Sequence, residues 1–390
     1  MTTTAADPQE NPSVPWRKLV AAIAAVSVAG VAFGHSLPLF SILLELYGAS
    51  DSAIGLNAGA AALAAILATP FFPPLIIRIG HKPFILCCLL TLPLTYGGLY
   101  LAGDNIPLWY PLRFLFGAAA AGLFVASEIW INSVAPPPLR GRIIGIYGTC
   151  LALGFAIGPL LIDAFGYEGF IPFAVGMLIF TSAAIPILLS PAPPAAHHDA
   201  AKSFFDLLPK APVTFGAATI FAGIETAVLV FLPVFALEKG WAGEVGARAV
   251  SAYAFGIVAF QYLIGRLSDT VGYNRTLLTC SIASTIGAVF FWMVSGSILA
   301  SYGVLFLYGG AIAGIYTVGL TLIGDRFGAH DLAAANTGFV FTYGLGAVII
   351  PILGGFVRDI AGPAGFNVYL IVILSLYAGL VIMRRRERLP

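Results

Sequence analysis

Twelve long apolar stretches follow one another along this chain of 390 residues. Each is long enough to cross the hydrocarbon core of a bilayer as a helix, which takes about 20 residues. None alternates between polar and apolar residues in the way that the strands of a membrane barrel do. We expect spans at residues 18–47, 52–78, 83–103, 108–134, 143–165, 170–190, 213–237, 247–268, 276–296, 302–325, 335–357 and 366–384. The sequence therefore predicts an all-α membrane protein with twelve transmembrane helices in a lipid bilayer.

The composition excludes several other classes of protein. Hydrophobic residues make up 59% of the chain and charged residues only 9%, whereas a soluble domain carries about 25% charged residues. Nineteen basic residues stand against 18 acidic ones without a basic stripe, so no nucleic-acid partner is expected. The chain has no Walker-type lysine motif and no nucleophile elbow, so we expect neither an ATP-driven pump nor an enzyme.

Metal-binding and redox chemistry are not expected either. The four cysteines stand in apolar segments without C-x-x-C spacing. The adjacent His197 and His198 lack the spacing and the supporting carboxylates of a metal site. We therefore predict no metal and no cofactor.

Most basic residues fall on one side of the predicted membrane. If the first span starts in the cytoplasm, fifteen of the nineteen lysines and arginines lie in cytoplasmic loops and tails. By the positive-inside rule, this excess places both termini in the cytoplasm. The first fifteen residues lack the basic start of a signal peptide, so no cleavage is expected. The prediction is a multi-pass protein of the bacterial inner (plasma) membrane.

The second half of the chain repeats the first. A constant shift of 192 residues aligns Gly80 with Gly272, Tyr110 with Tyr302, Gly117 with Gly309, Gly122 with Gly314, Gly154 with Gly346 and Pro159 with Pro351. Because each half holds six spans, both halves have the same orientation, related by an axis along the membrane normal. A Pro- and Ala-rich loop separates them. We expect six-helix bundles at residues 1–190 and 213–390, joined by a cytoplasmic linker at 191–212.

Four segments carry a family resemblance. The loop GRLSDTVGYNR at 265–275 lies between the eighth and ninth spans, and its counterpart at 73–82 lacks the glycine and the aspartate. Arg113 begins the segment RFLFG, and Gly145, Gly154 and Gly158 keep a regular spacing in the fifth span. With these segments the chain resembles the major facilitator superfamily over essentially its whole length. The segment EIWIN at 128–132, followed by LRGR at 139–142, is similar to a bacterial branch of efflux members.

The resemblance implies a fold and a mode of action. Members are secondary transporters in which two six-helix bundles move a small-molecule substrate by alternating access, and a monomer is the family expectation. Spans 1, 4, 7 and 10 line the central cavity in that family. The fifth-span spacing resembles the family's antiporter motif without its closing glycine pair, which favours export. We expect a conformational latch near the cytoplasmic ends of the spans, formed by Arg78, Glu128, Asn132, Arg142, Asp269 and Arg275.

Three ionisable residues lie deep within the predicted spans. A charge at the middle of a bilayer costs at least about 2.5–3.5 kcal/mol, so each needs a specific reason to be there. Glu225, near the centre of the seventh span, is predicted to be the main proton-exchange group, tuned by Arg113 and His35. The alternatives are a permanently protonated structural glutamate, a hydrogen-bonded core histidine, and an arginine that snorkels to the outer headgroups.

The predicted substrate-binding residues lie mainly on the cavity-lining spans. They are His35, Arg113, Trp130, Glu225, Gln261, Tyr308 and Tyr316. A mostly apolar cavity with few polar points favours a hydrophobic or amphipathic substrate. The functional hypothesis is export of such a molecule in exchange for protons. Import of a metabolite or chelate, by proton symport or by uniport, is the open alternative.

Overall fold

The computed structural model describes residues 15–136, 139–193, 204–328 and 331–384. Over these residues the regular structure is helical, without strands. The helices are α1 (Trp16–Leu46), α2 (Asp51–Ala68), η1 (Thr69–Phe71), α3 (Phe72–Ile79), α4 (His81–Ala102), α5 (Ile106–Val134), α6 (Arg140–Ile157), α7 (Leu160–Phe165), α8 (Ile171–Ser182), α9 (Ala184–Leu189), η3 (Phe205–Lys210), α10 (Pro212–Glu238), α11 (Gly243–Val271), α12 (Tyr273–Val294), α13 (Ile298–Arg326) and α14 (Leu332–Arg384). His197, His198 and the basic residues after Arg384 lie outside the described ranges.

The long helix α14 accounts for two membrane crossings. Its backbone leaves the helical conformation at Gly362, where φ is 65° and ψ is −168°. As one straight helix, the segment Ala334–Arg384 would reach about 75 Å, far beyond a hydrocarbon core of about 30 Å. In the described ranges 11 helices are long and apolar enough to cross a membrane. Because the last of these is bent into two, the chain makes the predicted twelve crossings.

The fifth span is interrupted where the sequence has Gly158 and Pro159. Helix α6 ends just before this pair and α7 begins just after it. A Cβ atom on Gly158 would lie 2.5 Å from the backbone nitrogen of His35, so only glycine lets α1 come this close. The backbone of Gly158 and Pro159 itself stays in the helical region, and the close approach at Gly158 sets α6 directly against His35.

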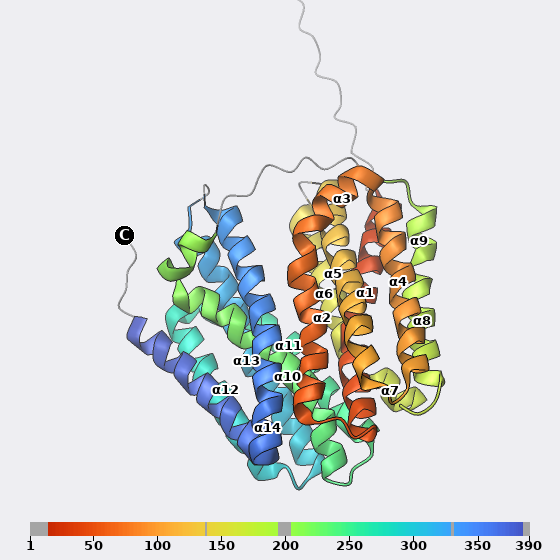
Figure 1. Cartoon of the computed structure of the whole chain (residues 1–390). Coiled ribbons are helices and arrows are strands. Elements are labelled where there is room, and N and C mark those ends of the chain that lie inside the picture. The colour runs from red at the N-terminus through yellow and green to blue at the C-terminus, as the bar shows by residue number, and fades with distance from the viewer. Residues whose placement is uncertain (1–14, 137–138, 194–203, 329–330, 385–390) are drawn as a thin grey trace, which may run out of the picture.

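The helices form two bundles that stand side by side (Figure 1). Helices α1–α9 make the first half and α10–α14 the second. Between the halves, α2 packs along α14, α6 and α7 pack against α11, and α1 meets α10. We call the end that carries Trp16 and η3 the linker end, at the top of Figure 1, and the other the opposite end.

Equivalent residues make equivalent contacts in the two halves. Gly122 of α5 packs against Cys88 of α4, and Gly314 of α13 packs against Cys280 of α12. The two cysteines are themselves related by the shift of 192 residues. The same shift relates two hydrogen bonds from tyrosine hydroxyls to backbone carbonyls, Tyr110 to Ala53 at 3.5 Å and Tyr302 to Val245 at 3.2 Å. The repeat in the sequence is thus a repeat in packing.

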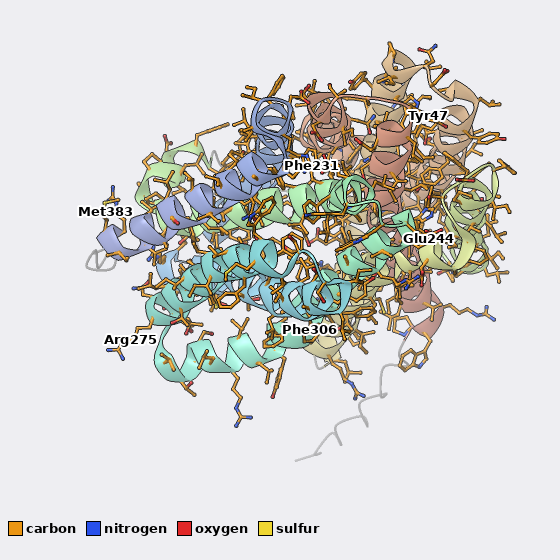
Figure 2. All side chains as sticks on the ribbon, turned by 90° about the horizontal axis from the view of Figure 1, so that it is seen from below. Tyr47, Phe231, Glu244, Arg275, Phe306 and Met383 are labelled. Atoms are coloured by element: carbon orange, nitrogen blue, oxygen red, sulfur yellow. The ribbon has the colours of Figure 1, made fainter. Side chains whose placement is uncertain are left out.

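Apolar side chains pack the interior of each bundle. Figure 2 looks at the molecule from below, with Tyr47 in the first half and with Arg275 and Met383 on the side of the second half that faces away from the first. Buried apolar residues of both halves form one continuous cluster. A smaller cluster around Leu207, Phe215 and Phe339 holds η3 against α10 and α14 at the linker end.

Candidate functional site

A carboxyl group lies near the middle of α10. Oε2 of Glu225 accepts a hydrogen bond of 2.8 Å from the hydroxyl of Tyr343 on α14. The Glu225 side chain is half-buried, and no lysine, arginine or histidine of the described residues pairs with it. An unpaired charge at this depth is costly, and either a bound proton or a cationic ligand removes that cost.

Aromatic rings surround this carboxyl group. The ring of Phe221 lies 4.8 Å from that of Tyr316 on α13, and both rings lie 6.1 Å from that of Tyr343, between centroids. Such faces attract cations, because the π-system carries negative charge on its faces. The surroundings of Glu225 therefore suit a group that is both apolar and positively charged.

A second carboxyl group, that of Glu128 in the first half, acts on Tyr316. Glu128 on α5 is exposed and lies close enough to Tyr316 to act on it electrostatically, as Glu225 also does. The backbone carbonyl of Glu128 accepts a hydrogen bond of 2.9 Å from Asn132, while its carboxylate makes no ion pair with the described residues. Tyr316 is thus within electrostatic reach of two carboxyl groups without a described cationic partner, one from each half.

The other two predicted proton-coupling residues form a separate cluster inside the first half. His35 of α1 is fully buried, with Nδ1 3.1 Å from the hydroxyl of Tyr96 on α4. Arg113 of α5 donates a hydrogen bond of 3.2 Å from Nη1 to Oγ of Ser36. The structure therefore brings Arg113 close to His35 and leaves Glu225 in the other half.

Arg113 is held by aromatic rings rather than by a carboxylate. Its guanidinium lies 5.0 Å from the ring centroid of Phe40 and 5.2 Å from that of Phe116. Only 1% of the residue is exposed, so it does not extend to the lipid headgroups. Within the described ranges it has no acidic partner. The first half thus buries a cation without a carboxylate, and the second half buries a carboxyl group without a cation.

The remaining predicted substrate-binding residues lie away from Glu225. Trp130 is fully buried, with its ring edge against His81. Gln261 is exposed on α11. Tyr308 is 3% exposed and its ring packs on that of Tyr253. Tyr316 alone among these joins the surroundings of the buried carboxyl group, and Tyr343, which the sequence analysis missed, joins it there.

The predicted latch residues make no ion pair with one another in the described chain. Arg78, Glu128, Asn132, Arg142, Asp269 and Arg275 are all exposed. No ion pair joins any of them within the described part of the chain. The latch itself stays a prediction, for a conformation in which the linker end is closed.

Ion pairs instead join the halves at the opposite end. Arg358 of α14 contacts Oδ1 of Asp51 on α2 through Nε at 2.8 Å. Its Nη2 lies 2.8 Å from Oε1 of Glu238 on α10, as an ion pair without hydrogen-bond geometry. The Arg358 side chain is 1% exposed. The sequence could have indicated this cluster, because Asp51, Glu238 and Arg358 all stand at ends of spans on the same predicted side of the membrane.

A second ion pair between the halves is open to solvent. Arg248 of α11 donates from Nε to Oδ1 of Asp163 on α7 at 2.7 Å. The two side chains are 48% and 32% exposed. Both cross-bundle ion pairs thus lie at the end away from the linker, where the halves are held together.

Comparison with known proteins gives the family. The sequence profile of the Major Facilitator Superfamily matches residues 22–248 and, separately, residues 214–390. The chain belongs to this superfamily. Its two overlapping matches follow the repeat described above.

Several major facilitator proteins are similar over most of their length. An uncharacterized MFS-type transporter of Bacillus subtilis (strain 168), YfkF, is 28% identical over 90% of this chain and 91% of its own. Multidrug resistance protein 2 of the same strain is 23% identical over 86% and 87%. The crystal structure of the nucleoside transporter NupG superposes with a TM-score of 0.76 over 95% of this chain and 100% of that one, at 14% identity.

Superfamily membership sets the general activity. Major facilitator proteins are multi-pass membrane transporters and not enzymes, and this chain transports a small molecule by secondary transport with alternating access. The twelve membrane crossings, the repeat of the two halves and the ion pairs that join them at the opposite end agree with that mechanism.

Proposed function

We propose that this protein exports a small hydrophobic or amphipathic molecule in exchange for protons, and that Glu225 carries the proton. The observation behind the proposal is a half-buried carboxyl group that has a tyrosine hydroxyl but no described cation beside it. Proton and substrate would then compete for one group, which couples their movements in opposite directions. His35 and Arg113, apart from Glu225, would tune the first half.

The substrate that fits best is an apolar cation. Glu128 and Glu225 offer two carboxyl groups without a described cationic partner, and both act electrostatically on Tyr316. Phe221 and Tyr343 add aromatic faces. A relative that is named as a multi-drug resistance efflux pump supports the direction of export.

The energy of the exchange is sufficient. One proton that crosses a potential of 100 mV releases about 2.3 kcal/mol, before any pH gradient is added. For an uncharged substrate this supports a gradient of roughly fiftyfold. Exchange of one proton for one monovalent cation moves no net charge, so for a cation the pH gradient supplies the energy.

We further propose the setting in which this exchange occurs. The protein would lie in the inner membrane as a monomer with both termini in the cytoplasm, as the distribution of basic residues favours. The two bundles would be 1–190 and 213–390, with 191–212 as the linker. The linker end would then face the cytoplasm.

Transport by reconstituted protein tests the proposal. Proteoliposomes with an imposed pH gradient should drive tetraphenylphosphonium, a hydrophobic cation, against its gradient. Glu225→Gln keeps the size of the side chain but cannot exchange a proton. Proton-driven flux should therefore fall at least tenfold, which corresponds to a loss of about 1.4 kcal/mol or more. Passive counterflow of the same cation needs no proton and should persist at saturating cation concentration, with a weaker apparent affinity because the carboxylate is lost.

Glu168→Gln provides the matched control. Glu168 is exposed in the loop before α8, and its substitution should leave both fluxes unchanged. If Glu225→Gln keeps proton-driven flux and its pH dependence, Glu225 is not the coupling group. Proton movement in the same direction as the substrate would instead support the import alternative.

A further inference from the structure

A hollow lies inside the second half, at the opposite end and outside the candidate site. It has an inner part of about 40 Å³ and an outer part of about 290 Å³, which share Phe235, Trp292 and Pro363 in their walls. The walls come from α10, α12, α13 and α14. The break of α14 at Gly362 lies beside its mouth, between the wall residues Ala361 and Pro363.

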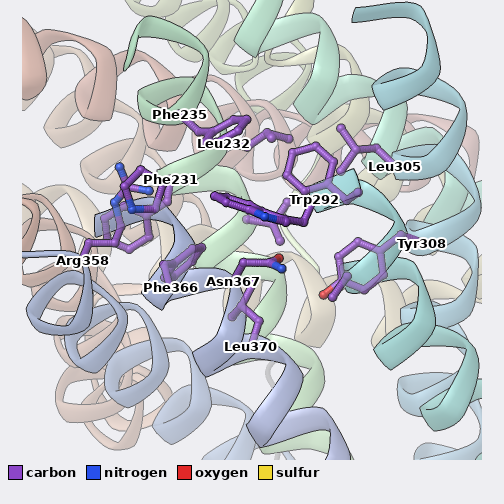
Figure 3. A pocket seen from close by; sticks show the side chains of 14 residues that line it. Phe231, Leu232, Phe235, Trp292, Leu305, Tyr308, Arg358, Phe366, Asn367 and Leu370 are labelled. Carbon is purple, nitrogen blue, oxygen red and sulfur yellow. The ribbon is translucent and has the colours of Figure 1, made fainter. Parts of the chain in front are cut away.

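The walls of the inner part are mainly aromatic and apolar, and their polar side chains are Tyr308, Asn367 and Arg358. Figure 3 shows Trp292 lying across the hollow, between Phe231 and Phe366 on one side and Tyr308 on the other. Trp292 is 37% exposed, so the hollow communicates with the surface of the bundle. The hydroxyl of Tyr308, 3% exposed, has no hydrogen-bond partner among the described residues. The outer part of about 290 Å³ has room for part of an acyl chain, whereas the inner part of about 40 Å³ has not.

The mouth carries one free positive charge. Glu238 and Lys239 both line the outer part of the hollow. Glu238 is engaged by Arg358 at 2.8 Å. Nζ of Lys239 lies 5.3 Å from the ring centroid of Phe235 and makes no ion pair in the described chain. A ligand with an anionic head and an apolar tail therefore matches both the mouth and the interior.

We propose that this hollow is a binding site for an anionic phospholipid, with its phosphate at Lys239 and one acyl chain between Phe235 and Trp292. The proposal does not depend on the substrate, the coupling ion or the direction of transport.

The same site is connected to the closure of the opposite end. The guanidinium of Arg358 lies 5.2 Å from the ring centroid of Phe231 and 5.7 Å from that of Phe366, and both rings line the hollow. Arg358 is also the residue that pairs with Asp51 of the first half. A lipid packed against these rings restrains Arg358 and so stabilises the conformation in which the opposite end is closed.

Thermal unfolding of the purified full-length protein in detergent tests the site. Phosphatidylglycerol should raise the melting temperature saturably, and phosphatidylcholine with the same acyl chains should act at least fivefold more weakly. Lys239→Gln should remove the preference for phosphatidylglycerol. Ala364→Trp, at an exposed wall position of the outer part, should fill the mouth and reduce the effect of both lipids.

Lys210→Gln is the matched control, because Lys210 is exposed on η3 at the linker end. It should keep the full preference for phosphatidylglycerol. Equal effects of the two lipids on the unmodified protein, or an unchanged preference in Lys239→Gln, would overturn the assignment of the phosphate. A full effect of glycerol phosphate alone, or an unchanged lipid effect in Ala364→Trp, would overturn the assignment of the acyl chain.

Discussion

At the scale of single residues, the two halves hold opposite kinds of polar group. Arg113 is buried with one described hydrogen bond, to Ser36, and two aromatic neighbours. Glu225 is half-buried with one described hydrogen bond, from Tyr343. A guanidinium cannot readily lose its proton, whereas a carboxyl group can gain one. The arginine therefore has to be stabilised permanently by its surroundings, and the glutamate is the group that is able to change its charge.

Substitution of Ser36 measures how much of that permanent stabilisation comes from one hydroxyl. Hydrogen bonds to charged groups contribute about 1.5–3 kcal/mol, so Ser36→Ala should lower the free energy of unfolding in detergent by that amount. Ser41→Ala is the matched control, because Ser41 is also buried on α1 and bonds only to the carbonyl of Pro38 in its own helix. Equal losses in the two variants would contradict a special contribution from the contact with Arg113.

At the scale of helices, glycines decide how closely the spans approach. A Cβ atom on Gly154 of α6 would lie 2.8 Å from both the carbonyl oxygen of Ser27 and the backbone nitrogen of Val31 on α1. A Cβ atom on Gly145 of the same helix would have no neighbouring atom within 4 Å. Backbone atoms cannot yield as a flexible side chain does, so Gly154→Val has to push α6 away from α1.

The two glycines therefore give a paired prediction. Gly154→Val should destabilise the protein by about 1–3 kcal/mol or more through overpacking, measured by unfolding in detergent. Gly145→Val should change stability by less than about 0.5 kcal/mol, the usual range for exposed substitutions. A similar loss at both positions would mean that side-chain volume in α6, rather than its approach to α1, determines stability.

The helices themselves were largely predictable, and several partners across the fold were not. Span limits follow from local composition, and the interruption at Gly158 follows from a local Gly-Pro pair. Asp51 and Arg358 are 307 residues apart, so their contact depends on how α2 and α14 pack. Tyr343 lies on the eleventh predicted span, outside the four spans that line the family's cavity, so the resemblance did not indicate it. Tyr308 lies on such a span, but its ring turns towards Tyr253, which the helical position alone does not determine.

At the scale of the whole molecule, the two ends are in different states. The opposite end is joined across the halves by the pairs Asp51–Arg358 and Asp163–Arg248. At the linker end, Arg142 and Asp269 are exposed and make no ion pair with the described residues. For a protein that works by alternating access, this is the arrangement of a conformation closed at one end and released at the other. The relative strength of the two cross-bundle pairs then decides how readily the closed end opens.

Burial predicts which of these two pairs holds the closed end. Removal of one partner from a buried pair costs about 3–5 kcal/mol, whereas an exposed pair contributes about 0–1 kcal/mol. The Arg358 side chain is 1% exposed and that of Asp51 16%, so Asp51→Asn should shift the equilibrium strongly towards opening. Asp163→Asn should not, because its pair is solvated.

A cysteine at Ala58, which is 4% exposed on α2, reports the change through its rate of labelling by a membrane-impermeant maleimide, in a variant without the four native cysteines. We expect the rate to rise at least tenfold in Asp51→Asn and by at most about fivefold in Asp163→Asn, following the conversion of 1.4 kcal/mol per factor of ten. The reverse order would show that the solvated pair controls the opposite end, and that burial of Arg358 serves the packing of the second half alone.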